Sequence, residues 1–289
     1  VLFRSLDGVA AADDELRDEG SARRFLANLC IIYGVVAVED PTPLRERLLF
    51  LKQYFDNQYA GQADEAPVQL LKGSCREFEA ECVWGHIGWQ LPNISHLRLG
   101  FYTSDIWDPE PTQGRDVAPV LKLLKDIQPD IVTVALDPEA SGPDTHYKVL
   151  QAVTAAVEQH VVTDGCTPDM TIWGYRNVWF RFEPHEVSSI IPVSLQSIAV
   201  LNQMFLSSFE SQRDAEFPAY EIQGPFCKMS QKVQVEQYGI LETCLGYEWF
   251  HKHESPLIRA TRGLIFLKEM SVTELLNESR ALRKQAQNF

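Results

Sequence analysis

The stretch Pro129-Asp130-Ile131-Val132-Thr133-Val134-Ala135 decides the fold class. Its run of β-branched and apolar residues is typical of a strand buried on both faces, as in a parallel sheet covered by helices. Pro129 favours the end of the preceding helix, because a residue before proline is disfavoured in helical conformation. Residues 116–127 carry apolar side chains at helical spacing, so we expect a helix that packs on the sheet.

Helical and strand patterns alternate along the rest of the chain. We expect strands at 96–102, 171–175, 187–193 and 263–267, and helices at 44–59, 66–86, 146–159, 195–209, 227–244 and 272–287. This alternation predicts an α/β fold of three layers with a Rossmann-like, mainly parallel sheet. We expect one domain over residues 1–212, and a C-terminal α+β extension over residues 213–289 that packs on the same domain.

Composition and charge narrow the function classes. The 289 residues, 45% hydrophobic and 23% charged, have the profile of an ordinary globular protein. A formal net charge of −14 repels phosphate backbones and anionic lipids, so we expect neither nucleic-acid nor membrane partners. Six cysteines without a Cys-x-x-Cys pair indicate a reducing compartment, which predicts a cytoplasmic protein.

The loop after the decisive strand is the first place to expect chemistry, because ligands of open α/β sheets bind outside the carboxyl ends of strands. This loop, residues 136–146, reads LDPEASGPDTH and ends at His146 in the first turn of the next predicted helix. The partial positive charge of a helix amino terminus favours a neutral imidazole, the form that binds a divalent metal. A capping or solvent-facing histidine is the plainer alternative.

Several short segments share their order and spacing with one family. They are Arg76–Ala80 with Trp84-Gly85, His96–Tyr102, Ile127–Val132, Asp137–His146, and Pro192–Ser194 with Ser211-Gln212. Together they resemble the LmbE/PIG-L family of zinc-dependent N-deacetylases. The stretches Trp173–Trp179 and His185–Val187 look like the subgroup in which this domain is fused behind a glucosamine-6-phosphate deaminase domain.

The resemblance implies removal of an acetyl group from an amino sugar such as an N-acetylglucosamine derivative. In the family, zinc is held by an early His-x-x-Asp pair and a later histidine, and an early aspartate acts as general base. His146 matches the later zinc ligand. We expect Asp137, Asp144 and His185 to assist catalysis around it.

The sugar itself is expected to contact two residues after a predicted strand. Tyr175 and Arg176 could bind a hydroxyl or a phosphate, since arginine offers a planar fork of donors. A surface salt bridge is the alternative for Arg176. His185 either replaces an oxyanion-stabilising histidine, at whose position this chain has Pro143, or is an exposed strand-edge residue paired with a neighbouring glutamate.

The early metal motif, of the type His-Pro-Asp-Asp, occurs nowhere in the sequence. Residues 6–10 resemble the stretch that follows this motif, so we expect the chain to begin after the metal-binding strand. One histidine cannot hold zinc where known sites use three or four protein ligands. We therefore expect this chain to be metal-free and inactive, even if its parent protein is a zinc hydrolase, as the resemblance implies.

Two further expectations concern partners and function class. The resemblance implies a glucosamine-6-phosphate deaminase domain as a fused or associated partner, and the sequence leaves the oligomeric state open. The alternative function is a non-catalytic sugar-binding or interaction module that keeps the same fold.

Overall fold

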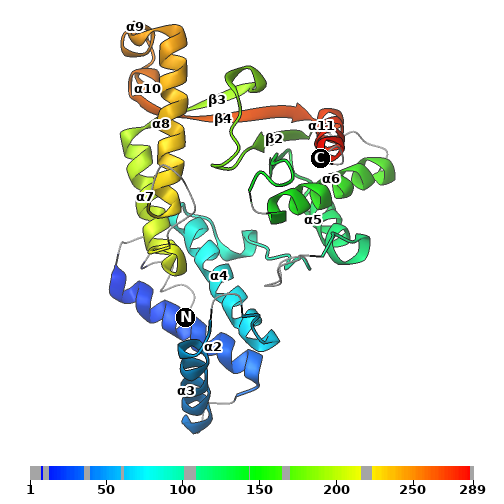
Figure 1. The fold of residues 1–289 in the computed structure, drawn as a ribbon, viewed down its shortest axis with the longest axis vertical. Helices are drawn as coiled ribbons and strands as arrows, with labels where there is room; N and C mark the ends of the chain where they lie inside the picture. Colours follow the sequence, from blue (N-terminus) through cyan, green and yellow to red (C-terminus); the bar gives the residue numbers. More distant parts are fainter. Residues whose placement is uncertain are drawn as a thin grey trace. The chain divides into compact units, whose positions relative to one another are not determined.

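The computed structural model describes residues 8, 13–35, 40–59, 62–100, 109–142, 144–164, 170–215 and 223–286 (Figure 1). The chain divides into two compact units. Unit 1 comprises the described residues within 1–96 and 202–217, and unit 2 comprises those within 97–103, 107–201 and 218–289.

Unit 1 is helical in its described residues. Its elements are α2 (Asp14–Tyr33), α3 (Thr42–Asp56), α4 (Ala66–His86), η1 (Leu91–Asn93), the second half of α7 (Leu195–Ser208) and η4 (Glu210–Gln212). α2 begins at Asp13, whose Oδ1 accepts a hydrogen bond from Leu16 N at 3.1 Å, and it ends at Gly34, which adopts a left-handed conformation with φ 64°. The core of the unit is apolar and contains Leu29, Leu51, Val68 and Leu71.

Unit 2 contains a four-stranded mixed sheet. Its strands β1 (Ile131–Ala135), β2 (Thr171–Tyr175), β3 (Ser189–Ser194) and β4 (Thr261–Ser271) lie in the order β1-β2-β4-β3. β1 and β2 are parallel, whereas β4 is antiparallel to both β2 and β3. The expectation of a mainly parallel sheet was therefore wrong for the described strands. The reason is that β4, eleven residues long and largely buried, enters the sheet between two strands from earlier in the chain.

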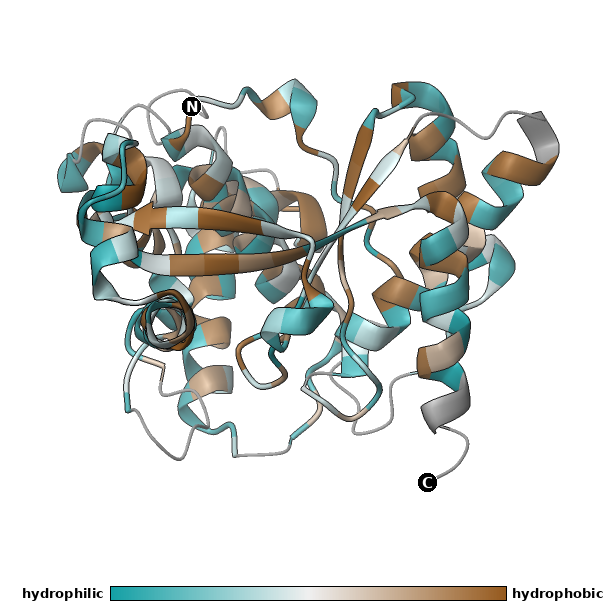
Figure 2. Cartoon of the chain, turned by 90° about the horizontal axis from the view of Figure 1, so that it is seen from above, coloured by the Kyte–Doolittle hydropathy of each residue, from teal (hydrophilic) through white to brown (hydrophobic). Residues whose placement is uncertain are grey.

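Helices contact this sheet and one another. They are η2 (Gln113–Val117), α5 (Ala118–Ile127), α6 (Asp144–Asp164), η3 (Pro184–Glu186), the first half of α7, α8 (Phe226–Leu245), α9 (Tyr247–His251), α10 (Pro256–Arg259) and α11 (Val272–Ala286). α6 contacts β1, α8 contacts β4, and α5 and α11 both contact α6. In Figure 2 the apolar residues concentrate along the strands, whereas the helices alternate between apolar and polar bands.

Several predicted elements are confirmed where their signals are local. The helix at 66–86 and the strands at 131–135 and 171–175 have the predicted bounds. A capping box begins α11: Ser271 N donates to Glu274 Oε2 at 2.7 Å, and Glu274 N donates to Ser271 Oγ at 3.3 Å.

Two details of the predicted sheet were wrong. Residues 96–100 form no strand, because Arg98 leaves the extended region with φ 48° and Gly100 N donates to Asp116 Oδ1 at 2.7 Å; residues 101 and 102 lie outside the described part. β1 is not buried on both faces, since Ile131 is 48% exposed. Among the described strands, β1 pairs only with β2 and therefore lies at an edge.

One observation from the sequence falls largely outside the described structure: of residues 6–10, only residue 8 is described.

The described helices were also compared with the length and hydropathy of a membrane span. None of them is long and apolar enough to cross a bilayer.

Candidate functional site at the ends of β1 and β2

The parallel pair of strands brings two chain segments together at one edge of the sheet. Ala135 at the end of β1 pairs with Tyr175 at the end of β2. Leu136 N then donates to Tyr175 O at 2.7 Å, which extends the pairing by one residue. Gly174 is needed here, because a Cβ at this position would lie 2.1 Å from Leu136 Cδ1. The loops that follow β1 and β2 therefore begin side by side.

Asp137 joins these two loops. Its carboxylate is almost completely buried, at 1% exposure for the residue. Oδ2 lies 2.8 Å from His146 Nδ1, and Oδ1 accepts a hydrogen bond from Asn177 N at 2.9 Å. An ionised carboxylate only accepts hydrogen bonds, so Nδ1 of His146 carries the proton that it donates to Asp137. One buried side chain thus fixes both the histidine ring and the start of the loop after β2.

His146 presents its other ring nitrogen as an acceptor. With the Nδ1 proton directed at Asp137, the neutral ring has its lone pair on Nε2. The side chain is 37% exposed, which leaves the imidazole accessible to a ligand. The predicted histidine is therefore held in one orientation by the predicted aspartate.

Asn177 is a site residue that the sequence candidates did not include. Its Oδ1 accepts hydrogen bonds from Trp179 N and Phe180 N, both at 2.8 Å, and so fixes the turn after β2. Its Nδ2 is buried and has no hydrogen-bond partner among the described residues. A Cβ at Gly142 would lie 2.7 Å from this nitrogen, so the loop that leads to His146 passes close to the Asn177 amide. An asparagine directly after a strand was the available sequence signal.

Tyr175 and Arg176 leave the same strand in different environments. Tyr175 is 44% exposed at the end of β2. Arg176 has a side chain that is 8% exposed, and its Nη1 and Nη2 each lie 3.2 Å from an oxygen of Glu186. The guanidinium carbon also lies 4.6 Å and 4.3 Å from the ring centroids of Phe180 and Phe182. Arg176 thus forms the salt bridge of the plainer alternative, but with a buried guanidinium that braces the loop.

The contact with Arg176 changes the pKa of Glu186. Burial acts to raise the pKa of Glu186, but the hydrogen bond from Glu183 N and the charge of Arg176 outweigh burial and lower this pKa. Glu186 also closes η3, since its Oε2 accepts from Glu183 N at 2.8 Å.

Asp144 and His185 make contacts that do not involve the Asp137–His146 pair. Asp144, the first residue of α6, lies with its Oδ2 2.6 Å from the Nζ of the buried Lys148. His185 is exposed in η3. In the described part of the chain, neither residue forms a hydrogen bond or ion pair with Asp137 or His146. Pro143 lies outside the described residues.

The metal-ligating side chains of the described residues do not form a cluster. No group of three or more His, Cys, Asp and Glu side chains within these ranges is placed to hold a metal ion. Known zinc sites use three or four protein ligands. The described residues by themselves therefore do not fit a zinc ion.

One curated protein is similar to most of the chain. A glucosamine-6-phosphate deaminase-like protein of Bacteroides thetaiotaomicron is 26% identical over 219 residues, which are 75% of this chain and 32% of the relative. The chain thus spans about a third of the length of the curated relative that it matches. No family model matches the chain, and no solved structure matches it.

Proposed function

We propose that the chain is part of an amino-sugar-processing protein, and that an N-acyl amino sugar binds at the carboxyl ends of β1 and β2. The observation that carries this proposal is the buried Asp137 carboxylate, which holds the His146 ring at 2.8 Å and the Asn177 amide at 2.9 Å. The name of the curated relative supports an amino sugar as the class of ligand. The position of the site agrees with the general rule for ligands of α/β sheets.

The described side chains suit the two ends of such a ligand. His146 Nε2 would accept a hydrogen bond from the amide N–H or from a hydroxyl of the sugar. Tyr175, 44% exposed, offers a ring face to the apolar C–H groups of the sugar. Because Arg176 is already paired with Glu186, its role in this proposal is to hold the loop that carries Asn177.

Hydrolysis of the N-acyl group is proposed only for a longer protein. Amide hydrolysis requires polarisation of the carbonyl and a group that accepts and returns a proton. His146 would be one zinc ligand there, with Asp137 as the carboxylate that orients it. The remaining ligands would come from residues outside the described ones. We also propose the deaminase domain as a fused or associated partner, and a Rossmann-like three-layer arrangement for unit 2.

A non-catalytic sugar-binding module is the second candidate. It is favoured by the donor set, since the described residues contribute the oriented His146 but no three-ligand group. The two candidates share the same binding site. They differ in whether zinc and hydrolysis appear in the longer protein.

The binding proposal is tested by calorimetric titration of the chain with N-acetylglucosamine and with glucosamine. We expect N-acetylglucosamine to bind and His146→Ala to weaken it about tenfold. His251→Ala is the matched control, because His251 lies in α9 and stacks on Tyr247 with ring centroids 3.8 Å apart. Absence of binding, or equal affinity of His146→Ala and the unmodified chain, would contradict the proposed binding site.

A further inference from the structure

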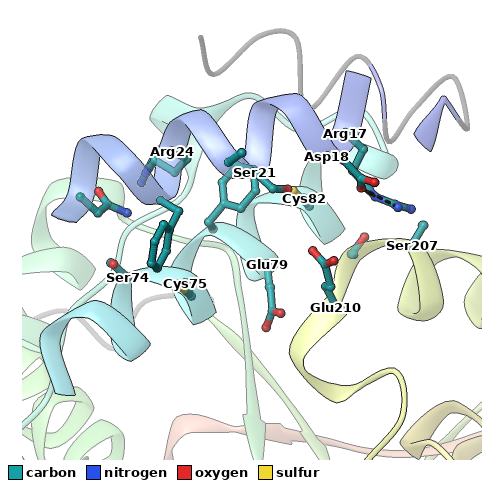
Figure 3. A pocket seen from close by; sticks show the side chains of 15 residues that line it. Arg17, Asp18, Ser21, Arg24, Ser74, Cys75, Glu79, Cys82, Ser207 and Glu210 are labelled. Carbon is teal, nitrogen blue, oxygen red and sulfur yellow. Dashed lines mark hydrogen bonds and ion pairs between the residues drawn. The ribbon is translucent and has the colours of Figure 1, made fainter. Parts of the chain in front are cut away.

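Unit 1 contains a pocket that shares no residue with the site in unit 2. It has a volume of about 440 Å³ and lies between α2, α4 and residues 207–210 (Figure 3). All of its lining residues belong to unit 1. Figure 3 shows side chains from these three segments around the pocket, including Arg17 from α2, Glu79 from α4 and Glu210.

Part of the pocket wall is apolar and uncharged. Phe25 and Phe78 supply aromatic surface, and Cys75 and Cys82 supply thiols. Burial raises the pKa of Cys75, and burial with the nearby charge of Glu81 raises the pKa of Cys82 to about 12. Both thiols therefore stay protonated at neutral pH. This part of the wall suits a ring or another apolar body.

The charged residues of the wall, apart from the exposed Glu210, are already paired within unit 1. Arg17 contacts Asp14 at 2.7 Å and Asp18 at 2.8 Å. A charged ligand would have to compete with these short contacts, or would be left without a counter-charge when it is buried.

Glu79 and Arg24, two further charged residues of the wall, are also paired. Glu79 accepts hydrogen bonds from Arg76 Nη1 at 2.8 Å and from Ser211 N at 2.6 Å. Arg24 Nη2 lies 3.2 Å from Glu81 Oε1. The exposed Glu210 is the one remaining acid at the rim, so the wall offers no unpaired cation to an anionic ligand among the described residues.

Two polar groups of the wall have no hydrogen-bond partner within the described part of the chain. Asn28 Nδ2 and Ser208 Oγ are buried and have no hydrogen-bond partner among the described residues. Both residues line the pocket. The amide of Asn28 can turn about its broad terminal torsion and the side chain of Ser208 can turn about χ1, and neither group loses a hydrogen bond by turning toward a ligand. The pocket therefore offers a donor and a hydroxyl beside aromatic surface.

We propose that this pocket binds an uncharged small molecule with a ring body and an amide or hydroxyl group. The ring packs against Phe25 and Phe78, and the polar group meets Asn28 or Ser208. Paired charges on the wall disfavour both anions and cations of the same shape, because the one acid without a pair in the described wall, Glu210, is exposed and its charge is screened by solvent. The proposal is independent of the amino-sugar site in unit 2.

The test uses three probes that share one ring and differ in charge. Benzamide, benzoate and benzylamine are titrated into the isotope-labelled full chain, and the backbone and side-chain amide resonances are followed by NMR. We expect benzamide to shift the Asn28 side-chain resonances and those of Phe25 and Phe78. Benzoate and benzylamine should bind at least about tenfold more weakly.

Two variants test whether benzamide binds beside Asn28. Asn28→Leu should weaken benzamide binding about fivefold, whereas Asn57→Leu, at the end of α3 in the same unit, should leave it unchanged. The charge series on the unmodified chain does not depend on the folding of either variant. A pocket that holds only water, so that no probe shifts these resonances, would overturn the proposal. Benzoate or benzylamine binding as tightly as benzamide would overturn it as well.

Discussion

The buried carboxylate of Asp137 holds the ring of His146 through Nδ1, with 2.8 Å between the two atoms. Because this contact places the proton on Nδ1, it leaves Nε2 of the neutral ring as a hydrogen-bond acceptor. The two residues lie at opposite ends of one loop, and the second oxygen of Asp137 ties that loop to Asn177. The chemistry proposed for the site depends on this pair.

Asp137→Asn should change the tautomer of His146. An amide at this position can keep its oxygen on Asn177 N only by turning its NH₂ group toward Nδ1, which then becomes an acceptor. We expect the proton to move to Nε2, and nitrogen chemical shifts of the labelled imidazole measure this directly. The ring of His251 in the same sample is the internal control. An unchanged tautomer at His146 would show that Asp137 does not determine it.

Asn177→Ala should destabilise unit 2. The substitution leaves Trp179 N and Phe180 N without their acceptor, and we expect a loss of about 1–3 kcal/mol in the free energy of unfolding, measured in urea. Asn277→Ala, on the exposed side of α11, is the matched control and should change this free energy by less than about 0.5 kcal/mol. Equal effects of the two variants would contradict the bracing role of Asn177.

Gly174→Ala should destabilise the strand ends by crowding. The new Cβ would lie 2.1 Å from Leu136 Cδ1, and we expect a cost of about 1–3 kcal/mol in thermal or urea unfolding. Gly239→Ala in α8 is the control, because a Cβ there has no neighbour within 4 Å and alanine favours a helix. Tolerance of alanine at position 174 would mean that Leu136 does not lie over this glycine.

Asp116 should make the stability of unit 2 depend on pH. Burial acts to raise its pKa, but hydrogen bonds from Arg115, Thr112 N and Gly100 N outweigh burial and lower the pKa in the folded state. A lowered folded-state pKa stabilises the fold above the unfolded value, and this contribution is lost as pH falls through the folded value.

The test compares Asp116→Asn with the unmodified chain across pH. At neutral pH we expect the variant to be less stable by about 1.5–3 kcal/mol, since the lost hydrogen bonds involve charged groups. The difference should shrink below about pH 4, where Asp116 of the unfolded chain begins to take up protons while the folded carboxylate, with its lowered pKa, stays ionised to lower pH. Asp126→Asn, whose partner Lys122 is exposed, should show little difference at any pH. A pH-independent gap at Asp116 would contradict this account.

The zinc content is expected to differ between this chain and a longer protein that contains it. We expect no stoichiometric zinc on the purified chain, because the described residues contribute His146 without two further ligands. In a longer protein that supplies two further zinc ligands, His146→Ala should remove zinc and deacetylation together. Elemental analysis measures the metal in both samples, and tight stoichiometric zinc on the chain itself would contradict the prediction.

The sequence predicted what depends on short-range signals. The strands at 131–135 and 171–175 are each determined by a few adjacent residues. The contact between Asp137 and His146 was also within reach, since both belong to one short loop after a predicted strand.

The rest depends on contacts between distant segments. β4 lies between β2 and β3 and pairs with residues about 100 positions away in β2 and about 70 positions away in β3, and no local pattern encodes its antiparallel direction. Asn177 was missed because it acts through its backbone N–H and through a turn, not through a reactive group. The pairing of Arg176 with Glu186 likewise required the loop between them to be seen in space.

The most direct test of the proposed site is an NMR measurement of nuclear Overhauser contacts between N-acetylglucosamine and the aromatic protons of the chain. The account predicts contacts from the sugar to the ring protons of His146 and Tyr175, and their loss in His146→Ala. Contacts confined to other rings, or none at a saturating sugar concentration, would contradict it.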